Sequence, residues 1–275
     1  MTALACRRLS THAELLEAAG GDPFVRWEVR ADQPLRGWAF PDGAVAFVRA
    51  TPSGRRQLAV LGTPEAALPA LRAHLDGRLT GPGSHGGFGS DGVTGLDGVD
   101  GHGHGLDRGV TVPQGTLELL GPDPRIGPGD DWEWLWTSTP PPEHPDVLPL
   151  GPADHDDVAA LLAVASPRHS ATVNDDDVRA WVGVRDAAGR LVACAAHTEH
   201  LPGVPHLASV ATHPAVRGRG LGQAVTGTLT ARALRAGAPV VTLGMYSDNA
   251  VARHMYRRLG FRGEQRWSSR RLLPR

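Results

Sequence analysis

The clearest structural pattern in this chain is the segment His206-Leu-Ala-Ser-Val-Ala-Thr-His-Pro-Ala-Val-Arg-Gly-Arg-Gly-Leu-Gly222. Its first part, Leu207 to Thr212, is apolar and predicts a short strand, and Pro214 predicts a turn after it. A glycine-rich loop follows and opens a helix, because apolar residues recur every four positions from Leu221. We expect this helix to end near Gly237.

The loop between the strand and the helix has the properties of an anion-binding site. Backbone N–H groups at a helix N-terminus are free to donate, and the helix dipole adds partial positive charge there. Arg217 and Arg219 supply full charges beside them, and Gly218, Gly220 and Gly222 let an anion approach the backbone without side-chain clashes. The pattern predicts a cradle for a pyrophosphate.

Two common phosphate motifs do not fit this loop. A P-loop would end in Gly-Lys-Ser or Gly-Lys-Thr, and a dinucleotide fingerprint would be followed by an acidic residue on the next strand, which Val240 to Met245 lacks. The pattern Arg217-x-x-Gly220-x-Gly222 instead resembles the acyl-CoA pyrophosphate loop of the GNAT N-acetyltransferase superfamily. Taken alone, the loop is equally consistent with an ordinary glycine-rich turn.

A second motif supports the resemblance. Asn249-x-x-Ala252-x-x-x-Tyr256-x-x-x-Gly260-Phe261 follows the strand Val240 to Met245 and resembles the last conserved segment of GNAT enzymes. On a helix, the first three of these residues share one face, and Gly260 is placed to end that helix. Without the motif, the default interpretation of Tyr256 is a core aromatic residue. The region from Val210 to Gly222 looks most similar to the FR47-like branch of the superfamily.

The resemblance implies a set of cofactor contacts and an acid. In the family, a backbone N–H of the splayed strand, here about Val210, faces the thioester carbonyl. The Asn contacts the cofactor arm, and the Tyr lies near the sulfur as a candidate general acid. Acetyl-CoA or another acyl-CoA is therefore expected to contact Val210, Ala211, Thr212, Arg217, Gly218, Arg219, Gly220, Leu221, Gly222, Asn249, Ala252 and Tyr256.

The general base is less defined. Several family members carry a Glu at the start of the strand, at a position that corresponds here to His206. A histidine can accept an amine proton near neutral pH. Glu199 and His200, at the end of the preceding strand, are alternative candidates, and a surface role at the strand end is an equal alternative for His206.

Composition limits the class of protein. The chain has 275 residues, 41% of them apolar and 21% charged, with a formal net charge of −1 and two cysteines, Cys6 and Cys194. The near-neutral charge gives no support for a nucleic-acid partner, and no apolar run approaches a membrane span. Two isolated cysteines indicate no disulfide scaffold, and we expect a cytoplasmic protein.

The first half reads as a small α/β domain, residues 1–139. The capping-box pattern from Thr11 predicts a helix, and Thr63 predicts the start of another that runs to about Leu75. Strands are expected at 24–30, 38–40, 44–50, 57–61, 117–120 and 131–137, where three tryptophans alternate to form an apolar face.

Two segments lack such patterns. Residues 80–109 are rich in Gly, Asp, His and Ser and predict a mobile loop, and no metal site is expected of its histidines His85, His102 and His104. The proline-rich residues 140–145 predict a stiff linker between domains.

Residues 146–275 are expected to form the GNAT domain. Helices are predicted at 154–164, with Asp154 as N-cap, and near 175–180. Strands are predicted at 147–150, 181–185, 190–198 and 206–212, before the helix at Leu221 and the strand at Val240. The expected fold class is α/β, a mixed sheet preceded by a smaller α/β domain, which is either unrelated or a degenerate GNAT-like half.

The resemblance implies an acyl-CoA-dependent N-acyltransferase. The preferred reaction moves acetyl from acetyl-CoA to a primary amine of a small molecule or amino acid, by direct attack in a ternary complex. The alternatives are a non-catalytic CoA-binding or regulatory module and an acetyltransferase for protein N-termini or lysines. Nothing in the sequence indicates the oligomeric state.

Overall fold

The structure is a computed structural model that describes residues 5–50, 56–79, 109–263 and 265–274. The predicted glycine-rich loop lies outside these residues, apart from Gly109, and so do His85, His102 and His104.

The described residues pack into two units. Unit 1 contains residues 1–21, 31–130 and 268–275, and unit 2 contains Asp22–Arg30 and Asp131–Trp267. The proline-rich segment lies within unit 2, where the His144 N–H donates to Thr228 Oγ1 at 3.0 Å and Glu143 pairs with Arg232 at 3.2 Å. The domain boundaries expected from the sequence stay a prediction, and the packing divides the chain at other positions.

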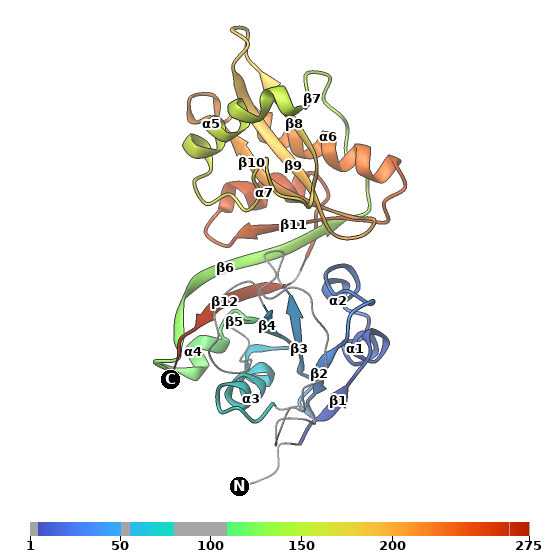
Figure 1. Cartoon of the computed structure of the whole chain (residues 1–275), viewed down its shortest axis with the longest axis vertical. Coiled ribbons are helices and arrows are strands. Elements are labelled where there is room, and N and C mark those ends of the chain that lie inside the picture. Colours follow the sequence, from blue (N-terminus) through green and yellow to red (C-terminus); the bar gives the residue numbers. More distant parts are fainter. Residues whose placement is uncertain (1–4, 51–55, 80–108, 264, 275) are drawn as a thin grey trace, which may run out of the picture. The chain divides into compact units, whose positions relative to one another are not determined.

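Unit 1 is a mixed sheet covered by helix α3. Its strands lie in the order β1-β2-β3-β4-β5-β12, with β1 to β4 antiparallel and β4 parallel to β5. Helix α3 packs on β3, β4 and β5 (Figure 1). The elements are β1 (Arg7–Leu9), α1 (His12–Ala18), β2 (Arg36–Ala39), β3 (Val45–Ala50), β4 (Arg56–Leu61), α3 (Pro64–Leu75), β5 (Gly109–Pro113) and α4 (Thr116–Leu120).

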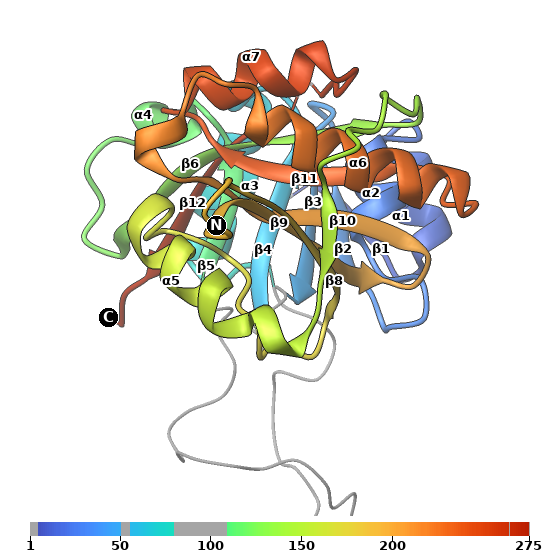
Figure 2. The same cartoon turned by 90° about the horizontal axis from the view of Figure 1, so that it is seen from above.

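Unit 2 also contains a mixed set of strands, in the order β6-β11-β10-β9-β8-β7, with β10 and β11 parallel. Helices α6 and α7 lie on one face and α5 on the other (Figure 2). The elements are α2 (Pro23–Glu28), β6 (Ile126–Thr137), β7 (Leu148–Leu150), α5 (His155–Ala165), β8 (Val178–Arg185), β9 (Leu191–Leu201), β10 (Val204–Thr212), α6 (Leu221–Arg235), β11 (Val241–Tyr246) and α7 (Ala250–Arg258). Strand β12 (Arg266–Leu272) follows α7 in the chain, and most of it belongs to unit 1.

The two units repeat one topology. In each, an edge strand is followed by helical structure, three antiparallel strands, a crossover helix, a parallel strand and a short helix. The crossover is α3 between β4 and β5 in unit 1, and α6 between β10 and β11 in unit 2. The last strand of each unit is exchanged between the two halves of the chain. Most of β6, which follows the elements of unit 1 in sequence, belongs to unit 2, and most of β12, which follows those of unit 2, belongs to unit 1. This repeat is what a degenerate GNAT-like half would produce.

Several local predictions are confirmed. Thr11 forms the capping box of α1 with Glu14, and Thr63 caps α3. Gly260, with φ of 85°, follows the end of α7. Trp134 of the alternating tryptophans is fully buried and packs edge-on against Phe24 at 5.5 Å between ring centres, so the expected apolar face exists.

Three predicted elements are wrong. Of residues 24–30, those up to Glu28 lie in helix α2 instead of a strand, because Asp22 accepts hydrogen bonds from the N–H groups of Phe24 and Val25, and Pro23 suits a first helical turn. Residues 117–120 lie in helix α4. Its flanking glycines, Gly115 and Gly121, adopt positive φ at both ends.

The third error is the short helix near 175–180. A turn in which Asp175 accepts from the Thr172 N–H ends there, and strand β8 begins at Val178. The side chain of Asp154 does not cap α5 as expected. It accepts instead from the Gly151 N–H at 2.8 Å and from Arg185.

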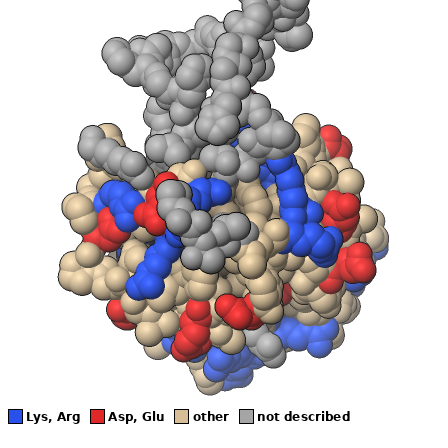
Figure 3. Space-filling view, turned by 90° about the horizontal axis from the view of Figure 1, so that it is seen from below, with Lys and Arg blue, Asp and Glu red and all other residues tan. Residues whose placement is uncertain are grey.

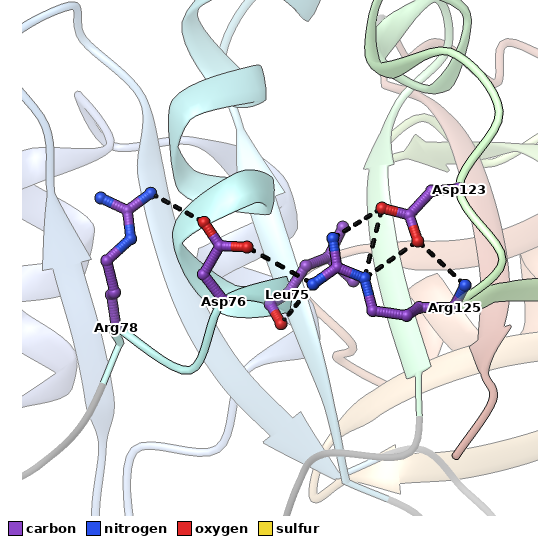
Figure 4. Close-up of polar contacts among 5 residues, drawn as sticks. All are labelled: Leu75, Asp76, Arg78, Asp123 and Arg125. Atoms are coloured by element: carbon purple, nitrogen blue, oxygen red, sulfur yellow. Dashed lines mark hydrogen bonds and ion pairs between the residues drawn. The ribbon is translucent and has the colours of Figure 1, made fainter. Parts of the chain in front are cut away.

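A polar network fixes one corner of unit 1 (Figure 4). Arg125 pairs with Asp123 at 2.6 Å and donates to the Leu75 carbonyl, at the end of α3, at 2.7 Å. The arginine also lies 3.4 Å from Asp76, which pairs with Arg78. Arg125 thus supplies a donor to a carbonyl in the last turn of α3, and the network anchors α3 to the turn before β6.

Candidate active site

The loop before α6 is an open anion cradle. Gly218 and Gly220 have φ of 80° and 79°, and a Cβ added at either would meet no atom within 4 Å. The backbone N–H groups of Gly218 to Gly222 have no hydrogen-bond acceptor among the described residues. Helix α6 has no side-chain cap and no acidic residue in its first turn. These are the features that an external anion requires.

The matching helix of unit 1, α3, has a capped N-terminus. Thr63 Oγ1 accepts from the Ala66 N–H at 3.3 Å, Pro64 has no N–H to offer, and Glu65 places an acidic group in the first turn. A phosphate at this position would meet a negative charge and donors that are already used. Among the described residues, the cradle therefore belongs to unit 2 alone.

The two arginines of the cradle differ. Arg219 is exposed. The guanidinium of Arg217 donates to the carbonyls of Thr212 at 3.2 Å and Ala165 at 3.1 Å, so it links the end of β10 to the end of α5. Arg217 keeps its charge beside the cradle, but it also braces the loop, a role that the sequence did not indicate.

Strand β10 separates from β11 next to the cradle. The two strands pair only at His206 and Leu207, and a bulge interrupts the pairing with β9 between Ala208 and Ala211. Val210 lies in this bulge and is unpaired on both sides, as the expected position opposite a thioester carbonyl requires. The splayed strand of the sequence prediction is thus present.

Ser209 holds the bulge in place. It is the one residue other than glycine with positive φ in the described chain, at 50°. Its buried hydroxyl donates to the Ala171 carbonyl at 2.8 Å and accepts from the Ala171 N–H at 2.9 Å. These two bonds tie the loop after α5 to the bulge, and they stabilise a strained backbone.

The second motif lies on α7. The Asn249 side-chain oxygen accepts from the Ala252 N–H at 3.0 Å and so caps the helix, which leaves the amide NH₂ as a donor for a ligand. Ala252 packs partly buried against the core of unit 2. The motif therefore has a structural role at its first residue in addition to the expected cofactor contact.

Tyr256 is part of the core of unit 2. It is 6% exposed and its ring lies 5.8 Å from that of Phe261. Burial raises the pKa of Tyr256 above its ordinary value, because the charged phenolate loses solvation. The phenol is therefore protonated throughout the neutral range and available only as a proton donor.

His206 lies where the pairing of β10 with β11 ends. Its Nδ1 is 2.9 Å from Thr242 Oγ1 and 3.5 Å from Glu28 Oε1. Glu28 comes from α2, far earlier in the chain, and accepts from the indole N–H of Trp134 at 2.8 Å. The His206 side chain is 17% exposed, so it is enclosed but accessible.

The two alternative bases are placed differently. His200 Nδ1 lies 2.8 Å from Asp177, and its ring centre is 5.1 Å from that of His206. Burial, followed by the neighbouring His206, lowers the pKa of His200. Glu199 accepts from the Gly203 N–H at 2.7 Å and pairs with Arg179, and both bonds lower its pKa. Neighbouring strand residues face opposite sides, so Glu199 points away from His206.

Sequence reasoning missed Glu28, Asp177, Thr242 and Ser209. Glu28 was placed within an expected strand, so no pattern connected it to His206. Thr242 could have been found, because it pairs with His206 across a parallel ladder, but only once the register was known.

Comparison with known proteins agrees with this geometry. Residues 132–261 match the model of the acetyltransferase (GNAT) family. This segment runs from Trp132 within β6 to Phe261, beyond the end of α7, and includes both motifs. These residues form a domain of the GNAT acetyltransferase family.

Several solved structures share the fold over nearly the whole chain. A GCN5-related N-acetyltransferase from Sphaerobacter thermophilus aligns with a TM-score of 0.52 and 16% identity over 97% of this chain and 95% of that one. A GNAT-family acetyltransferase from Colwellia psychrerythraea gives 0.50 and 14%, over 98% and 99%. A GNAT-family protein from Novosphingobium aromaticivorans gives 0.50 and 21%, over 94% and 95%. The shared fold thus includes the N-terminal half.

On the face drawn in Figure 3, arginines alternate with acidic side chains, and no field of one sign covers it. None of the helices in the described part of the chain is both long and apolar enough to cross a membrane.

Proposed function

We propose that the protein is an acyl-CoA-dependent N-acyltransferase whose site lies in unit 2. The observation that supports this most is the conjunction of an uncapped α6 N-terminus with the bulged end of β10. One places donors for a pyrophosphate, and the other leaves the Val210 backbone free of a partner strand. Unit 1 repeats the topology without either feature of the cradle.

The described residues fit an acyl-CoA. Its phosphates suit the N–H groups of Gly218 to Gly222 with Arg219 and Arg217. Its pantetheine arm suits the edge that β10 leaves open, together with the Asn249 amide. An acyl-CoA supplies an acyl group activated as a thioester. The favoured donor is acetyl-CoA, and the acyl chain length is a matter for measurement.

The side chains supply the proton transfers. As the amine nitrogen forms its bond to the acyl carbon, its proton passes to His206, which lies in the short paired stretch next to the splay. The carbon–sulfur bond then breaks, and the Tyr256 hydroxyl protonates the sulfur, since burial keeps that hydroxyl protonated. The Val210 N–H stabilises the negative charge that develops on the carbonyl oxygen in between. Solvent restores both side chains.

We propose a primary amine of a small molecule or amino acid as acceptor and direct attack in a ternary complex. We place the reaction in the cytoplasm, as the sequence indicates. A test is release of free thiol from acetyl-CoA across a panel of amino acids, polyamines, aminoglycosides and N-terminal peptides. Release that depends on an amine supports the proposal, and the best amine names the acceptor class. Binding of acetyl-CoA without release on any amine supports the CoA-binding module instead.

A further inference from the structure

The geometry points to Glu28 as a positioning residue of the acyl-transfer site, which we propose fixes the His206 imidazole as its Nδ1–H tautomer and leaves Nε2 to accept the amine proton. The inference rests on the proposed function for its catalytic meaning. The tautomer itself does not depend on that function.

The first support is the hydrogen-bond balance at His206 Nδ1. The hydroxyl of Thr242 has one proton, and it is directed at the Pro205 carbonyl, 3.5 Å away. At 2.9 Å from Nδ1, this hydroxyl can then accept from an Nδ1–H, which favours that tautomer. Glu28 Oε1, 3.5 Å from the same nitrogen, is also an acceptor and favours the same tautomer.

The second support is the way Glu28 is held. Its carboxylate is 11% exposed, and the indole N–H of the fully buried Trp134 donates to it at 2.8 Å. Burial of a carboxylate costs a large solvation free energy unless the group is hydrogen-bonded and paired. Because Trp134 has a fixed position on β6, its hydrogen bond fixes the position of the Glu28 carboxylate. The negative charge of Glu28 is therefore held facing His206.

The third support is the surroundings of the imidazole. The other titratable groups that face it are His200 on β9 and Asp177, which lies 2.8 Å from His200 Nδ1. Asp177 stabilises His200 in the way that Glu28 stabilises His206, and the two rings lie 5.1 Å apart. No described residue bonds to His206 Nε2, which is therefore the nitrogen available to a substrate.

Glu28 acts through His206 and does not itself exchange a proton. When His206 takes the amine proton, the imidazolium that forms lies beside a fixed negative charge. Glu28 comes from the N-terminal part of the chain, outside residues 132–261 that match the family model, so the site needs a segment beyond that domain.

The tautomer is tested by nitrogen NMR of imidazole-labelled protein, with His206 assigned through the His206→Gln variant. We expect Nδ1 to be protonated and Nε2 unprotonated at pH 8, and the preference to weaken in Glu28→Gln. An Nε2–H tautomer in the unsubstituted protein, or an unchanged spectrum in Glu28→Gln, overturns the inference. Neither result requires an acceptor, so the proposed function can fail separately.

Kinetics then test the catalytic meaning. We expect Glu28→Gln to lower kcat about tenfold, part of the roughly 10²-fold or more that a positioned base supplies, without change in KM for acetyl-CoA. In a His206→Gln background, we expect Glu28→Gln to cause no further fall in kcat. The control is Glu143→Gln, which removes an ion-paired carboxylate next to α6. An equal loss from Glu28→Gln in both backgrounds would show a purely structural role and overturn the inference.

Discussion

The indole of Trp134 donates a hydrogen bond to Glu28, and 106 positions separate the two residues in the chain. Glu28 in turn faces His206 at 3.5 Å. A helix from the N-terminal part and a strand from the middle thus meet at the point where β10 leaves β11. The proposed site is completed by segments that no motif in the sequence connects.

The cradle is tested by a pair of glycine substitutions. Gly220 and Gly189 both have φ of 79°, and a Cβ at either meets nothing within 4 Å, so Gly220→Val and Gly189→Val bear similar backbone strain. Only the first places a side chain among the phosphate donors. We expect Gly220→Val to weaken CoA binding at least about tenfold, since charged hydrogen bonds contribute about 1.5–3 kcal/mol each.

Tryptophan fluorescence titration with CoA measures both affinities. Gly189→Val, in the turn between β8 and β9, should bind as the unsubstituted protein does. Equal affinities in the two variants would show that α6 binds no phosphate.

Tyr256→Phe tests the general acid. The ring remains in the core, so we expect nearly unchanged folding and CoA affinity. The turnover number should fall by about 10²-fold or more, because no other donor replaces the hydroxyl. The matched control is Tyr246→Phe, the other tyrosine of the chain, whose hydroxyl donates to the Arg168 carbonyl. If Tyr256→Phe turns over normally, the residue is a core aromatic, and another group protonates the sulfur.

The two cysteines should differ in reactivity. Burial raises the pKa of the Cys194 thiol to about 12, so almost no thiolate exists near neutral pH. Cys6 is partly exposed. A disulfide reagent at pH 8 is expected to label one thiol in the native protein and two after denaturation, and none in native Cys6→Ser. Rapid labelling of native Cys6→Ser would mean that β9 opens more readily than its packing indicates.

The polar network of unit 1 predicts a pH dependence. The hydrogen bonds and charge of Arg125 lower the pKa of Asp123 to about 2. Because this folded value is depressed, the stabilisation is fully present above about pH 4, the ordinary value, and is lost as pH falls toward 2. Asp123→Asn should therefore lower the unfolding midpoint at pH 7 and converge with the unsubstituted protein near pH 2.

Thermal unfolding followed by circular dichroism between pH 2 and pH 7 measures this. The control is Glu17→Gln, which changes an exposed carboxylate on α1. A constant gap between Asp123→Asn and the unsubstituted protein at every pH would assign the effect to packing instead of charge.

Both motifs could be predicted from the sequence because their residues are local. The turn at Pro214 and the glycines act within a few positions, and the structure has the expected turn and helix start there. The Asn249 cap of α7 is local as well, but the sequence prediction gave Asn249 only a cofactor contact. Helix α2 was missed because its apolar residues pack against tryptophans of distant strands, while Asp22 and Pro23 set its start. Glu28, Thr242 and the Ser209 bond to Ala171 depend on strand register, which periodicity does not contain.

For a related reason, the sequence could not decide whether the N-terminal half repeats the topology of the C-terminal half. Helix α3 of unit 1 begins with a Thr63 cap at the place where α6 of unit 2 begins with glycines. A topology depends on apolar patterning and can recur without the motif, so no repeated motif reveals it in the sequence.

The proposed function depends most on binding of the acyl-CoA pyrophosphate at the N-terminus of α6. Calorimetric titration of the full chain with acetyl-CoA, with CoA and with a pantetheine thioester that lacks the pyrophosphate measures this binding. We expect micromolar binding of the first two at one site per chain and at least about tenfold weaker binding of the third. Absence of binding by acetyl-CoA and CoA would contradict it, and so would equal binding of all three.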